Sequence, residues 1–203
     1  MRSEGAFWLR ISVFMLIFTL VAGCSPKKIS LYEKFQSSRA YKNAYRKATK
    51  TKRVYSGLQT GFIVSVTRLT PEYREALLRE IYRMYYLDEE RKEKFRKYVL
   101  DEGKGKERFF IALYTPDENL NDLDKENGHW SIRLVTEDDR ALPPLSVEKI
   151  KFSPEEVSRL FPLEDTRWFR FYDVTFDAAS GGDKLKVVLL SPVGRAALVY
   201  TPE

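Results

Sequence analysis

The sequence predicts a mainly β protein, an immunoglobulin-like antiparallel β-sandwich of about seven strands with a helical segment inserted at 71–102. Three observations predict this class. Short runs of alternating apolar and polar residues recur after residue 54. Turn-forming residues separate these runs, and only one long segment has a helical period. The alternative is an α+β domain in which one antiparallel sheet packs on helices.

The first predicted strand runs from Val54 to Thr67, and the inserted helical segment follows it directly. Thr70-Pro71-Glu72 predicts the start of a helix. Threonine caps the first turn, proline fits there, and an acidic side chain favours the positive end of the helix dipole. Apolar residues continue at helical spacing to Tyr85, and the acidic cluster 88–90 predicts a break before a second helical piece.

The rest of the chain returns to a period of two. Residues 109–114 are apolar on both faces, which is typical of a central strand. Ser153-Pro154-Glu155-Glu156 is a capping box that predicts one or two helical turns, ending near Pro162. The other predicted strands cover residues 129–134, 147–152, 168–176, 185–190 and 196–200, and the last two form a hairpin around Pro192-Val193-Gly194.

The N-terminus has the pattern of an export signal. The basic residues Arg2 and Arg10 precede a twelve-residue apolar run, Ile11–Ala22. This run is too short to cross a bilayer core of about 30 Å as a helix. Leu20-Val21-Ala22-Gly23-Cys24 follows, and Cys24 is the chain's single cysteine. This pentapeptide resembles the lipobox of bacterial lipoproteins.

The resemblance implies cleavage between Gly23 and Cys24 and attachment of a diacylglyceryl group to the thiol. Acyl chains on Cys24, such as palmitate, would anchor the protein in a membrane of the bacterial cell envelope. Ser25 follows the cysteine. In a Gram-negative cell this resembles the pattern that permits transfer to the outer membrane, facing the periplasm.

The charge of the chain is unevenly distributed. The net charge is +6, yet residues 27–53 hold ten basic residues against Glu33 alone. Residues 54–203 hold 23 basic and 27 acidic residues, a charge of −4. We therefore expect three parts: a cleaved signal peptide at 1–23, a lipidated basic tether at 24–53 that is either helical or disordered, and a single globular β-sandwich-like domain at 54–203.

The basic tether is expected to contact anionic lipid headgroups or an acidic envelope polymer, or else to act only as a spacer. Tyr41, Ala44, Tyr45 and Ala48 recur at helical spacing and permit an amphipathic helix. Because export would separate the protein from nucleic acid, we expect no nucleic-acid partner. The residues expected at the anionic surface are Lys42, Arg46, Lys47, Lys50, Lys52 and Arg53.

Few residues suggest catalysis or metal binding. One cysteine and one histidine exclude a disulfide framework and a multi-histidine metal cage. His129 begins a predicted strand, no Gly-x-Ser-x-Gly motif is present, and the acidic loop 117–128 departs from the spacing of an EF-hand. Adjacent carboxylates at Glu89-Glu90, Asp138-Asp139 and Glu155-Glu156 point apart and make poor acid–base pairs.

We therefore expect no catalytic residues, cofactor or bound metal. The predicted function is that of a non-enzymatic binding or assembly module with an unidentified protein partner. The alternative is an envelope enzyme that acts on polysaccharide or peptidoglycan through two carboxylates, which would need a cleft with the two groups facing each other.

Overall fold

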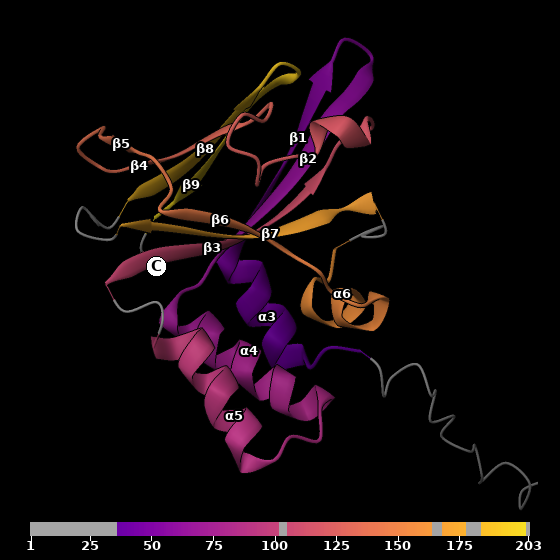
Figure 1. The fold of residues 1–203 in the computed structure, drawn as a ribbon, viewed down its shortest axis with the longest axis vertical. Coiled ribbons are helices and arrows are strands. Elements are labelled where there is room, and N and C mark those ends of the chain that lie inside the picture. Colours follow the sequence, from indigo (N-terminus) through magenta and orange to yellow (C-terminus); the bar gives the residue numbers. More distant parts are fainter. Residues whose placement is uncertain (1–35, 102–104, 164–167, 178–183, 202–203) are drawn as a thin grey trace, which may run out of the picture. The chain divides into compact units, whose positions relative to one another are not determined.

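A five-stranded antiparallel sheet forms the middle layer of the fold (Figure 1). The computed structural model describes residues 36–101, 105–163, 168–177 and 184–201. The strands of this sheet follow the order β1-β2-β3-β7-β6. Their bounds are β1 Thr49–Ser56, β2 Gln59–Arg68, β3 Lys106–Tyr114, β6 Ser146–Ile150 and β7 Arg170–Asp177.

The central strand of this sheet is β3, as its sequence predicts. It pairs with β2 on one side and β7 on the other, and the side chains from Arg108 to Ala112 are buried on both faces. A strand covered on both faces needs an almost continuous apolar run, because each side chain loses contact with water.

The second sheet has four strands in the order β5-β4-β8-β9 and packs on one face of the first. Its strands are β4 Ser131–Val135, β5 Ala141–Leu142, β8 Leu185–Ser191 and β9 Gly194–Tyr200. Phe62, Val64 and Val66 of β2 meet Val187 and Leu189 of β8 in the core between the sheets. The prediction of a mainly β, sandwich-like fold is therefore confirmed, with nine strands among the described residues.

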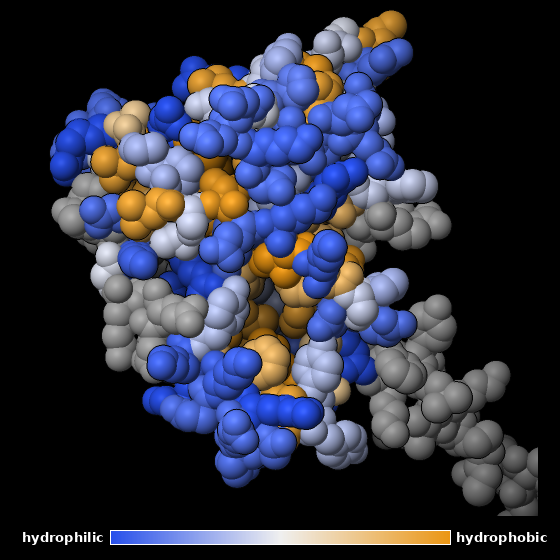
Figure 2. All heavy atoms as spheres, in the orientation of Figure 1, coloured by the Kyte–Doolittle hydropathy of each residue, from blue (hydrophilic) through white to orange (hydrophobic). Residues whose placement is uncertain are grey.

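Helices cover the other face of the five-stranded sheet. They are α3 Arg39–Ala48, α4 Pro71–Met84, α5 Glu89–Arg96 and α6 Pro154–Leu160, with a π-helical turn η1 at Lys97–Asp101 and a 3-10 turn η2 at Glu118–Leu120. Phe110 and Phe171 of the sheet pack with Leu77 of α4 and Leu160 of α6. Figure 2 shows hydrophobic atoms gathered where the helical layer meets the sheet. The fold thus combines both predicted classes, a two-sheet sandwich and a sheet packed on helices.

The predicted caps of α4 and α6 are present. Thr70 accepts a hydrogen bond from the amide of Tyr73, 3.2 Å away. Ser153 and Glu156 form a reciprocal capping box, with the Ser153 amide 2.7 Å from a Glu156 carboxylate oxygen. The predicted break at Asp88 is also found, because its side chain accepts from the Arg91 amide and starts α5.

The single strand predicted at Val54–Thr67 is instead part of a hairpin, β1 and β2. The turn falls at Gly57, whose φ of 63° places it in the left-handed region that glycine adopts at low cost. The sequence Ser56-Gly57-Leu58 lacks the Asn-Gly or Asp-Gly pair that commonly marks such turns. The turn was therefore not predicted, and the two strands were predicted as one.

Residues 36–53, the part of the predicted tether that the structure describes, belong to the same compact unit as the predicted globular domain. By their contacts, residues 36–203 form one compact unit, and the predicted signal peptide and the first part of the predicted tether lie outside the described residues. Within 36–53, the expected helix is present as α3, and its stripe of Tyr41, Tyr45 and Ala48 is buried. A buried apolar stripe makes this helix part of the core, so the compact unit includes the basic residues after Gln36.

Two buried ionic side chains join the helical layer to the sheet. Asp173 of β7 accepts hydrogen bonds from the Arg108 guanidinium of β3, with Nε to oxygen distances of 2.9 and 3.0 Å. The Tyr98 hydroxyl of η1 donates to the same carboxylate at 2.8 Å. The Arg108 Cζ atom also lies 4.2 Å from the centre of the Tyr98 ring. These contacts hold η1 against the face of the five-stranded sheet that the helices cover.

Candidate functional site

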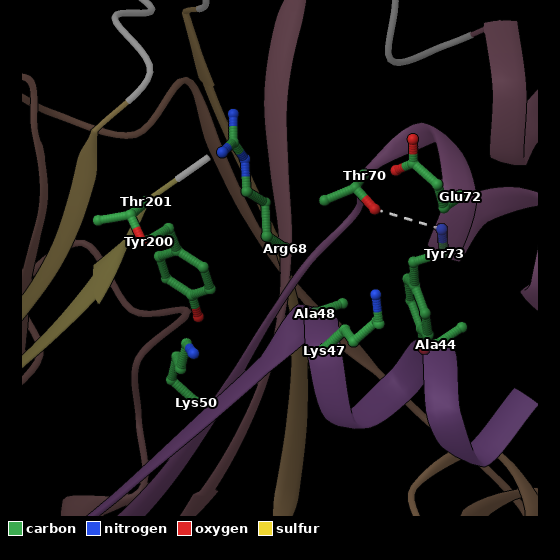
Figure 3. Close-up of a pocket in the computed structure, with 10 residues that line it drawn as sticks. All are labelled: Ala44, Lys47, Ala48, Lys50, Arg68, Thr70, Glu72, Tyr73, Tyr200 and Thr201. Atoms are coloured by element: carbon green, nitrogen blue, oxygen red, sulfur yellow. Dashed lines mark hydrogen bonds between the residues drawn. The ribbon is translucent and has the colours of Figure 1, made fainter. Parts of the chain in front are cut away.

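A cationic groove lies where α3 passes into β1 (Figure 3). Its volume is about 560 Å³, within the range typical of small-molecule sites. Lys47 comes from the last turn of α3, Lys50 from the start of β1, and Arg68 from the end of β2. The opposite wall contains Tyr200 and Thr201, at the end of β9.

The local fold explains how these residues meet. α3 ends at Ala48 and the chain continues without a loop into β1, so Lys47 and Lys50 stand on either side of this junction. β9 lies against β1, and the Tyr200 hydroxyl donates to the carbonyl of Val66, 2.6 Å away. The groove is therefore built from three segments that are distant in sequence.

The groove is positively charged but partly neutralised. Arg68 donates to both Glu107 carboxylate oxygens, at 3.0 and 2.8 Å, and in Figure 3 its side chain extends away from the two lysines. Glu72, at the start of α4, also lies on the rim. Burial raises the pKa of Tyr200 above its usual value, although Arg68 opposes that shift, so this hydroxyl stays protonated at neutral pH. The lysines and hydroxyls of such a groove suit a phosphate or carboxylate.

The structure brings together only two of the six basic residues that we expected at an anionic surface, Lys47 and Lys50. Lys42 lies on another flank of α3, where its ammonium is 3.3 Å from the Gln36 side-chain oxygen. Arg53 lines a different groove. The remaining two, Arg46 and Lys52, are exposed and line neither groove.

The predicted lipidation site is not described by the structure. Gly23, Cys24 and the rest of the lipobox lie outside the described residues. Within the part of the chain that is described, no helix has both the length and the apolarity needed to span a bilayer.

His129 and the acidic loop form a local hydrogen-bonded unit. The His129 ring nitrogen Nδ1 lies 3.0 Å from an Asp122 carboxylate oxygen, and the His129 amide donates to the other oxygen at 3.1 Å. Burial alone would raise the pKa of Asp122, but the hydrogen bonds from His129 outweigh it and hold the pKa below 3.8. Glu118 pairs with Arg170, and no three potential metal ligands cluster within the described ranges.

One member of each pair of adjacent carboxylates has a local partner in the described structure. Glu156 serves the capping box and accepts from the Tyr85 hydroxyl. Asp138 accepts from Arg140 and from Thr136. Glu89 pairs with Lys92, 2.6 Å away on the surface of α5. Each of these carboxylates therefore has a local structural role.

No local pattern in the sequence predicted that Arg68, Tyr200 or Thr201 would line this groove. Their approach depends on β9 lying beside β1, which is a contact between strands at opposite ends of the compact unit. Local periodicity carries no information about such long-range pairing. No protein-family profile, curated protein or solved structure matches this chain.

Proposed function

We propose that this protein is a bacterial cell-envelope lipoprotein that acts as a non-enzymatic binding module for an anionic group. The observation that carries the binding proposal is the placement of Lys47 and Lys50 on one groove, which Arg68 also lines while it is paired with Glu107. The lipobox pattern ending at Cys24 supports the anchor. In a Gram-negative cell the protein would lie at the outer membrane, facing the periplasm.

The groove suits a phosphate group on a lipid headgroup or envelope polymer. Lysine ammonium groups bind phosphate as point charges, and each basic residue near an anionic surface contributes about 1 kcal/mol. The unit 36–203 holds 30 basic and 27 acidic residues and so carries +3, rather than the −4 of residues 54–203 alone.

The proposal for the fold is an immunoglobulin-like sandwich with added helices. The edge-on contact of the Trp130 and Phe62 rings, with centres 4.9 Å apart, supports it, since such sandwiches often bury a tryptophan near the core. The helices on the outer face of the five-stranded sheet would be additions to that architecture.

The anchor is tested by metabolic labelling. Bacteria that express the chain are fed a palmitate analogue, and Cys24→Ala should abolish the label because the acyl chain has no thiol to bind. Ser25→Ala, which keeps the cysteine, should label like the wild type. Continued labelling of Cys24→Ala would contradict the proposal.

The groove is tested on the mature chain, residues 24–203 with Cys24→Ala, by vesicle sedimentation at low salt. Vesicles with phosphatidylglycerol should bind more protein than vesicles of phosphatidylcholine alone. The double variant Lys47→Gln/Lys50→Gln should lose most of this difference. Lys42→Gln/Arg46→Gln removes the same charge from another flank of α3 and is the matched control. Equal losses in both variants would show diffuse attraction and overturn the groove.

A further inference from the structure

An apolar cavity lies between the helical layer and the five-stranded sheet. Its volume is about 130 Å³. Side chains of α4, η1, β3 and α6 form its wall, and Figure 2 shows hydrophobic atoms where these helices meet the sheet. The apolar side chains that matter to the argument are Leu77, Ile81, Phe95, Val99, Phe110 and Leu160.

The polar side chains on the wall already have partners within the protein. These side chains are Tyr73, Tyr85, Tyr98 and Glu156. The Tyr85 hydroxyl donates to Glu156, and the Tyr98 hydroxyl donates to Asp173 at 2.8 Å. The Tyr73 hydroxyl lies 2.9 Å from that of Tyr41. A buried water makes about three hydrogen bonds, so this wall holds water poorly and favours an apolar ligand.

The size of the cavity limits the ligand. In another protein, a cavity of about 150 Å³ lined by leucine, isoleucine and phenylalanine stays dry and binds benzene or xenon. The cavity beneath α4 has nearly that volume and the same kinds of side chain on its wall. By this comparison it can hold a group of about six carbon atoms, whereas a fused ring system would not fit.

The cavity reaches the surface beside α5 and η1. Phe95 and Tyr98 line it and yet are 36% and 39% exposed, so the mouth lies next to them. No residue of α5 is buried, and Phe95 is the only apolar side chain of this helix. A segment with few buried apolar contacts opens at a lower free-energy cost than the core does. A ligand can therefore enter past α5 while both sheets stay folded.

We propose that this cavity binds an apolar hydrocarbon group of about six carbon atoms, which comes from a free ring or from the end of an alkyl chain. Binding would remove the surface of the group and of the cavity wall from water, which is the driving force. The cavity shares Tyr73 with the cationic groove but needs neither an anionic ligand nor acylation of Cys24. Its failure would therefore leave the proposed anchor and the proposed phosphate site unaffected.

The test follows methyl resonances by NMR in residues 24–203 with Cys24→Ala, so that neither a detergent nor an attached acyl chain competes for the cavity. Benzene represents the free ring, and octylphosphocholine below its critical micelle concentration represents the chain end. Binding should shift the methyl signals of Leu77 and Ile81 saturably. The signals of Val187 and Leu189, in the core between the sheets, should stay in place. Phosphocholine, which lacks the chain, should shift none of them.

The two ligands distinguish the sources of the hydrocarbon group. Saturable shifts with benzene alone would identify a free apolar molecule as the ligand. Shifts with octylphosphocholine would show that the end of an alkyl chain enters while its polar head remains outside. Absence of a saturable shift with both ligands, or equal shifts of the Val187 and Leu189 signals, would overturn the proposal.

Variants that fill the cavity test where the ligand binds. Val99→Phe should lower the affinity by about tenfold and Val99→Leu by less, because the added carbon atoms occupy the space of the ligand. Val187→Leu adds the same methylene group to the core between the sheets and is the matched control, which should leave the affinity unchanged. Lys47→Gln/Lys50→Gln should also leave it unchanged.

Urea unfolding supplies a second measurement on the same variants. Val99→Leu should keep the unfolding midpoint of the parent chain, since the cavity has room for the added group, whereas Val187→Leu should lower it by overpacking. Val99→Leu also keeps the test available should Val99→Phe fail to fold. An unchanged affinity in the folded variants of Val99 would overturn the proposal.

Discussion

Removal of the Asp173 carboxylate should destabilise the fold more than any surface change. In Asp173→Asn the Arg108 guanidinium stays buried, since its side chain is only 6% exposed, but it loses its counter-charge. Breaking one partner of a buried pair costs about 3–5 kcal/mol, because the remaining charge cannot regain water. The Tyr98 hydroxyl, now 2.8 Å from Asp173, would also lose its charged acceptor.

The measurement is urea unfolding followed by circular dichroism, with the change in midpoint read at constant slope. The double variant Arg108→Met/Asp173→Leu removes both charges and should recover most of the loss, because apolar replacement of a buried pair is often close to neutral. Glu75→Gln breaks an exposed pair with Arg79, whose side chain is 68% exposed, and should cost less than about 1 kcal/mol. An Asp173→Asn cost as small as that control, or a double variant as unstable as the sum of the two single changes, would refute the reasoning.

Three further predictions concern the turns, the acidic loop and α3. Gly194→Ala should cost about 2–3 kcal/mol in the same assay, because its φ is 142° and an added Cβ would lie 2.6 Å from Val54 Cγ1. Gly57→Ala, with no atom near its Cβ, should cost about 1 kcal/mol. Asp122→Asn should cost about 1–2 kcal/mol at pH 7. The pKa of Asp122 is lower in the folded protein than its usual 3.8, so the ionised carboxylate stabilises the fold above that pH, and the difference from the wild type should shrink as the pH falls below it. Tyr41→Phe should cost about 1–3 kcal/mol, because the Leu160 carbonyl, 2.7 Å from the Tyr41 hydroxyl, loses its buried donor.

Each of these has a distinct control. Val54→Ala in the Gly194→Ala background should recover the steric part of the loss, and a Gly194→Ala cost no larger than that of Gly57→Ala would disprove the clash. A pH-independent loss in Asp122→Asn would mean that its charge does not matter. Tyr86→Phe, at a fully exposed tyrosine, should be silent, and an equally silent Tyr41→Phe would argue against docking of α3 in the core.

Local signals predicted much of the fold. Thr70, Asp88 and Ser153 marked helix starts correctly, because a capping side chain acts on amides only two or three residues away. The apolar run at 109–114 correctly marked the central strand β3.

Two features depended on contacts that local patterns do not encode. The basic residues around α3 suggested a solvated tether, yet the Tyr41 hydroxyl bonds to Tyr73 and Leu160 inside the core. Likewise, Arg68 and Tyr200 come together only through the packing of β9 on β1. The sequence predicted Lys47 and Lys50 as cations of a binding surface. It did not predict which residues would lie beside them in the groove.

The docking of α3 also bears on when the protein can fold. The Tyr41 hydroxyl bonds to a carbonyl 119 positions later, and Tyr200 bonds back to Val66 across 134 positions. Chains dominated by such non-local contacts fold slowly, because distant segments must meet before either gains stability. The first helix of the unit cannot reach its partner in α6 until most of the chain has been synthesised. The compact unit can therefore complete its fold only after most of the chain has been synthesised.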